Sequence, residues 1–285
     1  MTEKSNRVLS NNWAKIRKSV VCGSRLATAK YRRLPDFMII GAMKCGTSSL
    51  YSYITQHPKI IGARKKEVHY FDWNYEKGTD WYKSNFPLQR KNNATKLTGE
   101  GTPMYMFCPV IAKRIHEQCP DIKLIVLLKN PVDRAISHYY HSLRSGREDK
   151  SIMDALLAEE DRTRESIERM SQGDCKWDKN LIWHTYKSRG LYLDQIENYW
   201  QYFDPDQILI LSTEQLTVFF EKEMAKVFTF LGVDAEFIVP DLRQKNVGQK
   251  KQEIKDDVTC YLKNYFLEPN ERLFEAIGKD LGWNN

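Results

Sequence analysis

The sequence predicts an α/β fold, a P-loop-like three-layer arrangement in which helices flank a central parallel sheet. Short apolar runs at 37–40, 122–128 and 207–211 have the length and composition of buried parallel strands. Helical patterns alternate with these runs, and such alternation is typical of a parallel sheet covered on both faces. No repeat or linker divides the 285 residues, so we expect one domain over 35–285 behind an N-terminal arm over 1–34.

Helices are expected where apolar residues recur every three or four positions. Thr47 can cap a helix that continues to His57, and Pro58 ends it. Pro131 suits the first turn of another helix, and Pro269 is expected near the start of the last one. The other expected helical ranges are 110–118, 151–170, 181–203, 214–231 and 269–279.

The positive charge of the chain is concentrated at its N-terminus. Residues 1–34 hold nine Lys and Arg and one acid, Glu3, a local surplus of +8 against the formal +7 of the whole chain. We interpret this arm as a solvated basic segment or an amphipathic helix, and we expect no nucleic-acid partner. Its longest apolar run, Val20-Val21-Cys22, is too short for a membrane span or a signal segment. These features predict a soluble, cytoplasmic protein.

The cysteines show neither disulfide nor metal-site spacing. No C-x-x-C pair is present, and no His lies at zinc-ligand spacing, so we expect free thiols, a reducing compartment and no metal. A disulfide between Cys108 and Cys119 stays open as an alternative. The six positions are Cys22, Cys45, Cys108, Cys119, Cys175 and Cys260.

The segment from Gly41 to Ser49 runs from a strand into a helix and has the glycines and small side chains of a phosphate-binding turn. It differs from the G-x-x-x-x-G-K-[ST] loop of triphosphate enzymes because Lys44 precedes Gly46 by two residues. The strand that follows ends in Lys129, where such enzymes place a metal-binding Asp. The pattern therefore favours a donor without a β,γ-phosphate tail. A P-loop kinase and a non-catalytic nucleotide- or polyanion-binding protein are the alternatives.

Two motifs carry a resemblance to a known family. Lys44-Cys45-Gly46-Thr47-Ser48 resembles the 5′-phosphosulfate loop of sulfotransferases that use 3′-phosphoadenosine 5′-phosphosulfate (PAPS). The segment from Lys129 to Tyr139 is similar to that family's 3′-phosphate motif, R-x-P-x-x-R-x-x-S-x-Y, with Lys in place of the first Arg. Lys66-Glu67-Val68-His69-Tyr70-Phe71 and Gly190-Leu191-Tyr192 resemble blocks of the heparan-sulfate-type and related bacterial branch.

The resemblance implies a metal-independent transfer of a sulfuryl group from PAPS to a hydroxyl or amine. Lys44 would stabilise charge on the leaving phosphate, and Ser137 would help to hold the 3′-phosphate. Lys129 keeps the charge of the usual Arg but lacks its bidentate fork, so we expect weaker recognition there. The donor-binding positions implied are Lys44, Cys45, Gly46, Thr47, Ser48, Ser49, Lys129, Ser137, Tyr192 and Lys250.

Glu67 is the expected general base, because the resembled branch uses this Glu and a cleft can raise a carboxylate's pKa towards neutrality. His69 is the rival base. Two residues apart on an extended segment, both side chains would point to the same side. A third interpretation makes Lys66 and Glu67 a surface ion pair without a catalytic role.

The acceptor side of the site is expected to include the block from Glu100 to Tyr105. Gly101 stands where heparan-type enzymes have a Lys, and the loss of this cation argues against a heavily sulfated polymer. Members of the bacterial branch that lack an anchor include tailoring enzymes of secondary metabolism, which suggests a small intracellular acceptor. The sequence leaves the acceptor, O- versus N-sulfation and the oligomeric state open.

Overall fold

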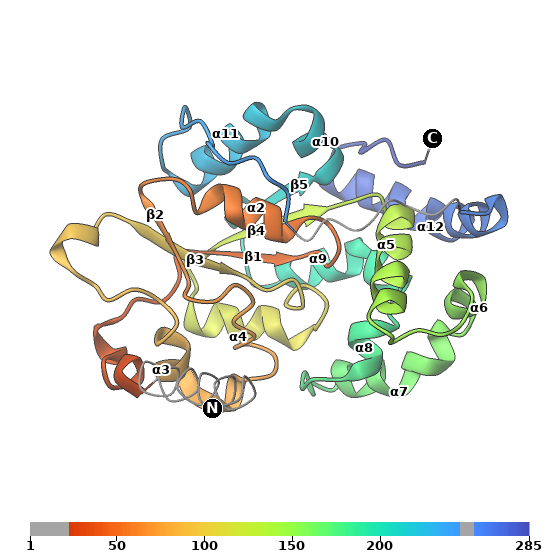
Figure 1. Ribbon diagram of the computed structural model, residues 1–285, viewed down its shortest axis with the longest axis horizontal. Helices are drawn as coiled ribbons and strands as arrows, with labels where there is room; N and C mark the ends of the chain where they lie inside the picture. Colours follow the sequence, from red (N-terminus) through yellow and green to blue (C-terminus); the bar gives the residue numbers. More distant parts are fainter. Residues whose placement is uncertain (1–22, 246–253, 285) are drawn as a thin grey trace, which may run out of the picture.

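Five parallel strands form the central sheet of the chain, whose computed structural model describes residues 23–245 and 254–284 (Figure 1). The strand order is β2-β3-β1-β4-β5, and every neighbouring pair is parallel. The strands are β1 Phe37–Gly41, β2 Ile60–Gly62, β3 Leu97–Gly101, β4 Lys123–Leu128 and β5 Ile208–Ser212.

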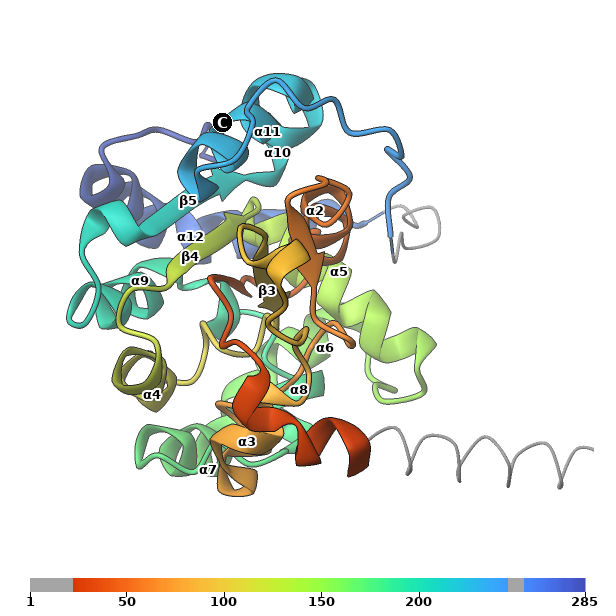
Figure 2. The same ribbon diagram turned by 90° about the vertical axis from the view of Figure 1, so that its left-hand side faces the viewer.

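Helices cover both faces of this sheet, which confirms the three-layer α/β prediction. Helix α2 contacts β1 and β3, and α11 contacts β5 and α2, so these two helices share one face. Helices α4 and α9 contact each other, and Figure 2 shows α2 and α4 on opposite sides of the strands. The helices on and around the sheet are α2 Thr47–Ile54, α3 Gly78–Lys83, α4 Val110–Gln118, α5 Pro131–Arg144, α9 Tyr192–Trp200, α10 Thr213–Val218, α11 Phe220–Leu231 and α12 Asp256–Ile277.

Three strand-to-helix turns meet at the carboxyl edge of the sheet. They lead from β1 into α2, from β4 into α5 and from β5 into α10. Ligands of open α/β sheets bind at this edge, because the helix N-termini and the connecting loops converge there. Beyond α5 the chain forms three further helices, to the right in Figure 1: α6 Ile152–Leu157, α7 Glu159–Ser171 and α8 Lys179–Trp183.

The expected strands at β1, β4 and β5 are confirmed, whereas β2 and β3 carry no apolar run and were not predicted. β3 reads Leu-Thr-Gly-Glu-Gly and is nevertheless buried over its last four residues. Gly99 is required there, because a Cβ atom would lie 2.5 Å from the ring of Phe37 on β1. Glu100 is buried because two tyrosine hydroxyls bind its carboxylate, so tertiary contacts override the low strand propensity.

Three expected helices are each divided in two. The range 151–170 is broken at Ala158, and the range 214–231 is broken at Phe219. The range 181–203 is interrupted between α8 and α9 because the buried carboxylate of Glu159 accepts hydrogen bonds from the backbone N–H groups of Lys187 and Ser188. A tertiary contact of this kind leaves no periodic signal in the sequence.

Pro269 lies inside α12 and not near the start of a helix, so that prediction is wrong. The helix begins thirteen residues earlier, at Asp256, and buries Val258, Leu262 and Phe266. Contacts of α12 with α5 and α9 bury this face. The packing outweighs the hydrogen bond that a proline removes.

The described part of the expected arm packs against the domain. Ala29 is buried, and Arg32 donates from Nη1 to the carbonyl of Phe86 at 2.8 Å. Residues 1–22 lie outside the described residues, so the boundary at residue 34 and the role of the arm stay predictions. Within 23–245 and 254–284, no helix has the length and apolar content needed to cross a membrane.

Cys108 and Cys175 form a disulfide, which corrects the expectation of free thiols throughout. The alternative pairing is wrong as well, because Cys119 is a free, buried thiol. The bond joins the residue two positions before α4 to the loop between α7 and α8, across 67 residues of sequence. Such a partner could not be read from spacing. A disulfide is typical of an oxidising compartment and not of the reducing one that we expected.

Candidate active site

The turn from β1 to α2 has the conformation of an anion-binding loop. Lys44 and Gly46 adopt positive φ angles of 73° and 90°, and Gly46 is the N-cap of α2. Thr47 is thus the first helical residue and not the cap that we expected. The first N–H groups of a helix lack intrahelical acceptors and attract anions. The Thr213 hydroxyl fixes the loop, because it lies 2.7 Å from the Cys45 carbonyl oxygen and 2.8 Å from that of Leu128.

This loop forms one wall of a cavity of about 1000 Å³. One end is formed mainly by α2, α10 and the segment that follows α11, with Tyr53, Leu216, Phe220 and Leu242 in its lining. Tyr53 and Phe220 pack there edge to face, with ring centroids 5.1 Å apart. The lining also includes Glu67, His69, Trp73, Pro103, Met104, Ile182, Trp183 and Arg189.

Several positive charges surround Lys44. Burial, followed by the charges of Arg144, Arg134 and Lys129, lowers the pKa of Lys44 to about 8. Four cations near one another favour loss of a proton unless an anion joins them. The geometry of the loop and the charge around it therefore both indicate an anionic ligand.

Lys129 and Ser137 line the same cavity, as the 3′-phosphate motif predicts. Lys129 follows β4, and the next residue, Asn130, caps α5 by accepting from the N–H of Val132 at 3.0 Å. Tyr192 is buried behind the lining, where its hydroxyl donates to the Lys129 carbonyl at 2.8 Å. Tyr192 therefore positions Lys129 from behind.

The other implied donor-binding residues differ in their exposure to the cavity. Cys45 lines it but is fully buried, and burial raises the pKa of its thiol to about 11, so the thiol stays protonated at neutral pH. The Ser49 hydroxyl accepts from the N–H of Lys245 at 2.9 Å and thereby links α2 to the segment that follows α11. Lys250 lies outside the described residues.

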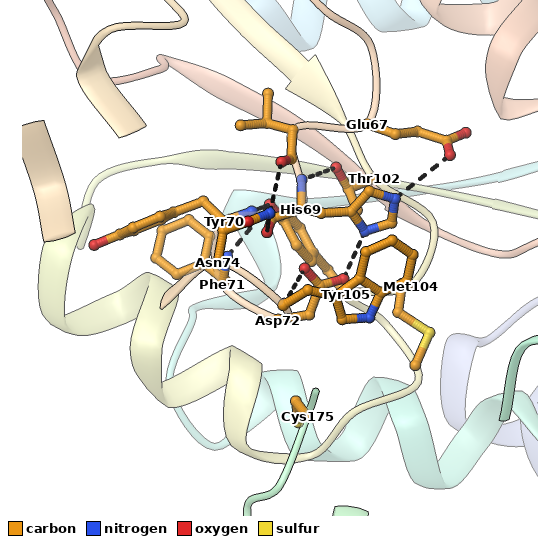
Figure 3. Close-up of polar contacts among 12 residues, drawn as sticks. Glu67, His69, Tyr70, Phe71, Asp72, Asn74, Thr102, Met104, Tyr105 and Cys175 are labelled. Atoms are coloured by element: carbon orange, nitrogen blue, oxygen red, sulfur yellow. Dashed lines mark hydrogen bonds and ion pairs between the residues drawn. The ribbon is translucent and has the colours of Figure 1, made fainter. Parts of the chain in front are cut away.

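Glu67, His69 and Asp72 form a chain of charged groups (Figure 3). His69 Nδ1 lies 2.8 Å from Asp72 Oδ2, and His69 Nε2 lies 3.7 Å from Glu67 Oε2. Lys66 Nζ lies 2.8 Å from Glu67 Oε1. Trp73 stacks on the imidazole with ring centroids 3.7 Å apart. The two candidate bases therefore contact each other. The expected Lys66–Glu67 ion pair is also present, and it belongs to the same group of residues.

The backbone that carries these groups is a turn and not the extended segment that we expected. Glu67 and His69 have positive φ angles of 62° and 55°. Their side chains still meet because the turn folds back on itself, as the bond from Asn74 Nδ2 to the His69 carbonyl at 2.6 Å shows. Asp72 and Trp73 were missed by the sequence analysis. Asp72 follows His69 by three residues, and this spacing is the signal that could have indicated it.

The expected rise in the pKa of Glu67 is also wrong. Burial by itself would raise it, but His69 and Lys66 outweigh burial and lower the pKa of Glu67 to about 2. Burial by itself would lower the pKa of His69, but Asp72 and Glu67 outweigh it and raise that pKa to about 9. At neutral pH the carboxylate is therefore ionised and the imidazole carries its proton.

The buried carboxylate of Glu100 fixes the position of this turn. It accepts from the Tyr82 hydroxyl at 2.7 Å, from the Thr102 hydroxyl at 2.7 Å and from the N–H of Val68 at 3.3 Å. The N–H of Glu67 donates to the Gly101 carbonyl at 3.1 Å. The end of β3 therefore holds Glu67 and its neighbours against the sheet.

Fold and site together define an α/β enzyme that binds an anionic nucleotide-like donor beside a carboxylate–imidazole pair. The sulfotransferase domain family matches residues 34–266, so the chain belongs to the sulfotransferase family. This assignment replaces the kinase and the non-catalytic alternatives. Among residues 23–245 and 254–284, no group of three or more His, Cys, Asp or Glu is placed to hold a metal ion.

Relatives of the chain include both bacterial and eukaryotic sulfotransferases. A crystal structure of a sulfotransferase from Alicyclobacillus acidocaldarius is 30% identical, with a TM-score of 0.70 over 89% of this chain and 100% of that one. The heparan sulfate glucosamine 3-O-sulfotransferase 6 of Homo sapiens is 28% identical over 88% of this chain and 74% of its own length.

A third relative corrects the expected cytoplasmic location. The membrane-associated sulfotransferase kil1 of Dictyostelium discoideum is 26% identical over 88% of this chain and 67% of its own length. The expectation rested on a missing apolar span and on free cysteines. A membrane-associated relative removes the first reason, and the Cys108–Cys175 disulfide removes the second.

His69 is expected to hold its proton to about pH 9, because Asp72 and Glu67 stabilise the imidazolium. Asp72→Asn removes the carboxylate at Nδ1, so the pKa of His69 should fall towards the ordinary value near 6.5. Nuclear magnetic resonance titration of the histidine side chains measures both values. Asp161→Asn, an exposed change on α7, is the control and should shift nothing. A pKa near 6.5 for His69 in the unchanged protein would contradict this charge arrangement.

Proposed function

We propose that this sulfotransferase uses PAPS and transfers its sulfuryl group to a hydroxyl of the acceptor, with Glu67 as the general base. One observation carries the proposal: the cation-rich phosphate loop lines the same cavity as Glu67 and His69, and Asp72 pairs with His69 from outside the lining. A group-transfer enzyme needs both parts, because the donor has to be held and the acceptor has to lose its proton.

The residues of the cavity fit the negative charges and the adenine ring of PAPS. Lys44 lies among other cations on a loop suited to an anion, and Lys129 and Ser137 offer a second position for a phosphate. The apolar and aromatic end, with Tyr53, Leu216 and Phe220, suits a purine ring. PAPS supplies an activated sulfuryl group on its 5′-phosphate, and 3′-phosphoadenosine 5′-phosphate is the product.

Glu67, and not His69, is the group able to take the acceptor proton. With its pKa raised to about 9, His69 is protonated at neutral pH and has no lone pair to offer, whereas Glu67 is ionised. His69 and Asp72 then hold the Glu67 carboxylate in place. Lys44 lies on the loop side, where its cation stabilises the charge that develops on the leaving phosphate.

Calorimetric titration with 3′-phosphoadenosine 5′-phosphate and with ATP tests the donor. The bisphosphate should bind without Mg²⁺ and ATP should not, because the loop holds its lysine ahead of Gly46 and Lys129 stands where a metal-binding Asp would be. Ser137→Ala should lower the affinity for the bisphosphate by about tenfold, because one hydrogen bond to a charged group is lost. Binding of ATP that depends on Mg²⁺, with no signal from the bisphosphate, would overturn the proposal.

Glu67→Gln should lower kcat by about 100-fold or more, since the amide cannot accept a proton, and it should leave bisphosphate affinity unchanged. Radiolabelled sulfate transfer and calorimetry provide the two measurements. Glu76→Gln, at an exposed glutamate outside the cavity lining, is the matched control and should retain full activity. Full activity of Glu67→Gln together with an inactive His69→Ala would assign the base to His69 instead.

For the acceptor we propose a small hydroxyl compound with an apolar face. Gly101 cannot carry this inference, because it is buried in β3 against Ile39 and is absent from the cavity lining. The composition of the wall beside Glu67 supports it instead: Trp73, Met104 and Trp183 are apolar or aromatic. Arg189 connects this wall to α8 by donating to Met104 Sδ at 3.0 Å and to the Leu181 carbonyl at 2.8 Å.

A transfer assay with phenols, simple alcohols and heparan sulfate oligosaccharides tests the acceptor class. Small hydroxyl compounds should be sulfated, and Trp183→Ala should raise their KM about tenfold through the loss of aromatic contact area. Trp177→Ala, an exposed tryptophan outside the cavity lining, is the control and should leave KM unchanged. Sulfation of the oligosaccharides alone would contradict the small-molecule proposal and favour the acceptor named for the human relative.

A further inference from the structure

Arg134, on the first turn of α5, has an unusual environment for a charged side chain. It is fully buried, and its Nη2 donates to the backbone carbonyl of Tyr186. Its Nε and Nη1 atoms have no hydrogen-bond partner among the residues that the structure describes. None of the ion pairs formed within that part of the chain includes Arg134. Arg134 is therefore a buried cation without a carboxylate partner.

Arg134 lies one helical turn before Ser137, which lines the cavity, and its charge reaches the phosphate loop. It acts on the thiol of Cys45, on the hydroxyl of Tyr192 and on the ammonium group of Lys44. Arg134 is absent from the cavity lining, whereas Cys45 and Lys44 belong to it.

A second buried arginine adds to this charge. Arg189 is 2% exposed and lines the cavity, with its Nε on the Thr185 hydroxyl at 2.7 Å. Burial, followed by the charge of Arg134, lowers the pKa of Arg189 to about 9. Two neighbouring buried cations destabilise each other in the free protein, and an anion bound nearby relieves that cost.

We propose that Arg134 is a positioning residue that strengthens the binding of the anionic donor through the phosphate loop, without touching the donor. This inference rests on the proposed function, because the donor supplies the anion. In a low-dielectric interior a charge acts over several ångströms, and its effect is largest where water is excluded. The alternative role is structural, in which Arg134 only links α5 to the Tyr186 carbonyl.

The substitution that separates these roles is Arg134→Met, which keeps an unbranched, though shorter, side chain and removes the charge. Replacing a buried, unpaired charge by an apolar group of similar volume is often tolerated by the fold. Affinity for 3′-phosphoadenosine 5′-phosphate should fall about tenfold at pH 7, and Arg134→Lys should restore most of it. If Arg134→Met does not fold, Arg134→Gln takes its place in the same measurements.

Arg32→Gln is the matched control. Arg32 is also buried and also donates to a backbone carbonyl, but it lies at the N-terminal end of the described chain and outside the cavity lining. Its loss should lower thermal stability and leave bisphosphate affinity unchanged. Arg134→Met should have a larger effect on bisphosphate affinity than on the thermal stability of the ligand-free protein.

The pH dependence of bisphosphate binding supplies a readout that a structural role would not move. The charged and titratable groups around Lys44 are Arg134, His138, His141 and Arg144 from α5, Lys129 from the end of β4, and Cys45 from its own loop. In the unchanged protein, affinity should begin to fall above about pH 8, where free Lys44 loses its proton. Without Arg134 the pKa of Lys44 rises, so this fall should begin at higher pH.

Calorimetry of the full chain from pH 6 to pH 10 distinguishes the failure of this inference from failure of the proposed function. If the unchanged protein binds no bisphosphate, the proposed function fails and the inference falls with it. If the unchanged protein binds, and Arg134→Met binds equally well with the same pH profile, the proposed function stands and Arg134 is structural. Weaker binding with the profile displaced to higher pH supports the inference.

Discussion

The site depends on an excess of positive charge at the carboxyl edge of a parallel sheet. Lys44 follows β1, whereas Lys129 follows β4 and Arg134 lies on the first turn of α5, so the sheet topology brings cations from two separate segments together. In the free protein this costs energy, which the lowered pKa of Lys44 records. An anionic donor bound at this edge of the sheet offsets that cost.

A second group of residues in the cavity wall keeps a carboxylate ionised and correctly placed in a partly buried turn. His69 balances the charge of Glu67 on one side, and Asp72 balances His69 on the other. The buried Glu100 on β3 holds the backbone of this turn through the N–H of Val68. Different groups therefore hold the turn and set the charge on Glu67: the end of β3 fixes the backbone, whereas His69 and Lys66 lower the pKa of the carboxylate.

Much of the fold and of the donor site could be predicted from particular residues. The apolar runs predicted β1, β4 and β5, and the phosphate loop, Lys129 and Ser137 line the cavity as their motifs predict. The short strand β3, the breaks before α9 and the Cys108–Cys175 pair could not be predicted, because each depends on partners distant in sequence. The expected cytoplasmic location was corrected by a membrane-associated relative, and its second support, free cysteines, was removed by a pairing that only the fold reveals.

The sequence by itself determined the fold class, the position of the phosphate loop and the identity of Glu67 and His69 as the candidate bases. These features are local, because strand patterns and loop motifs are written in consecutive residues. Only the tertiary structure decided which base is ionised and which charges surround Lys44. Protonation depends on groups that meet through space: Asp72 and Lys66 around the turn, and Arg134 and Arg144 around the loop.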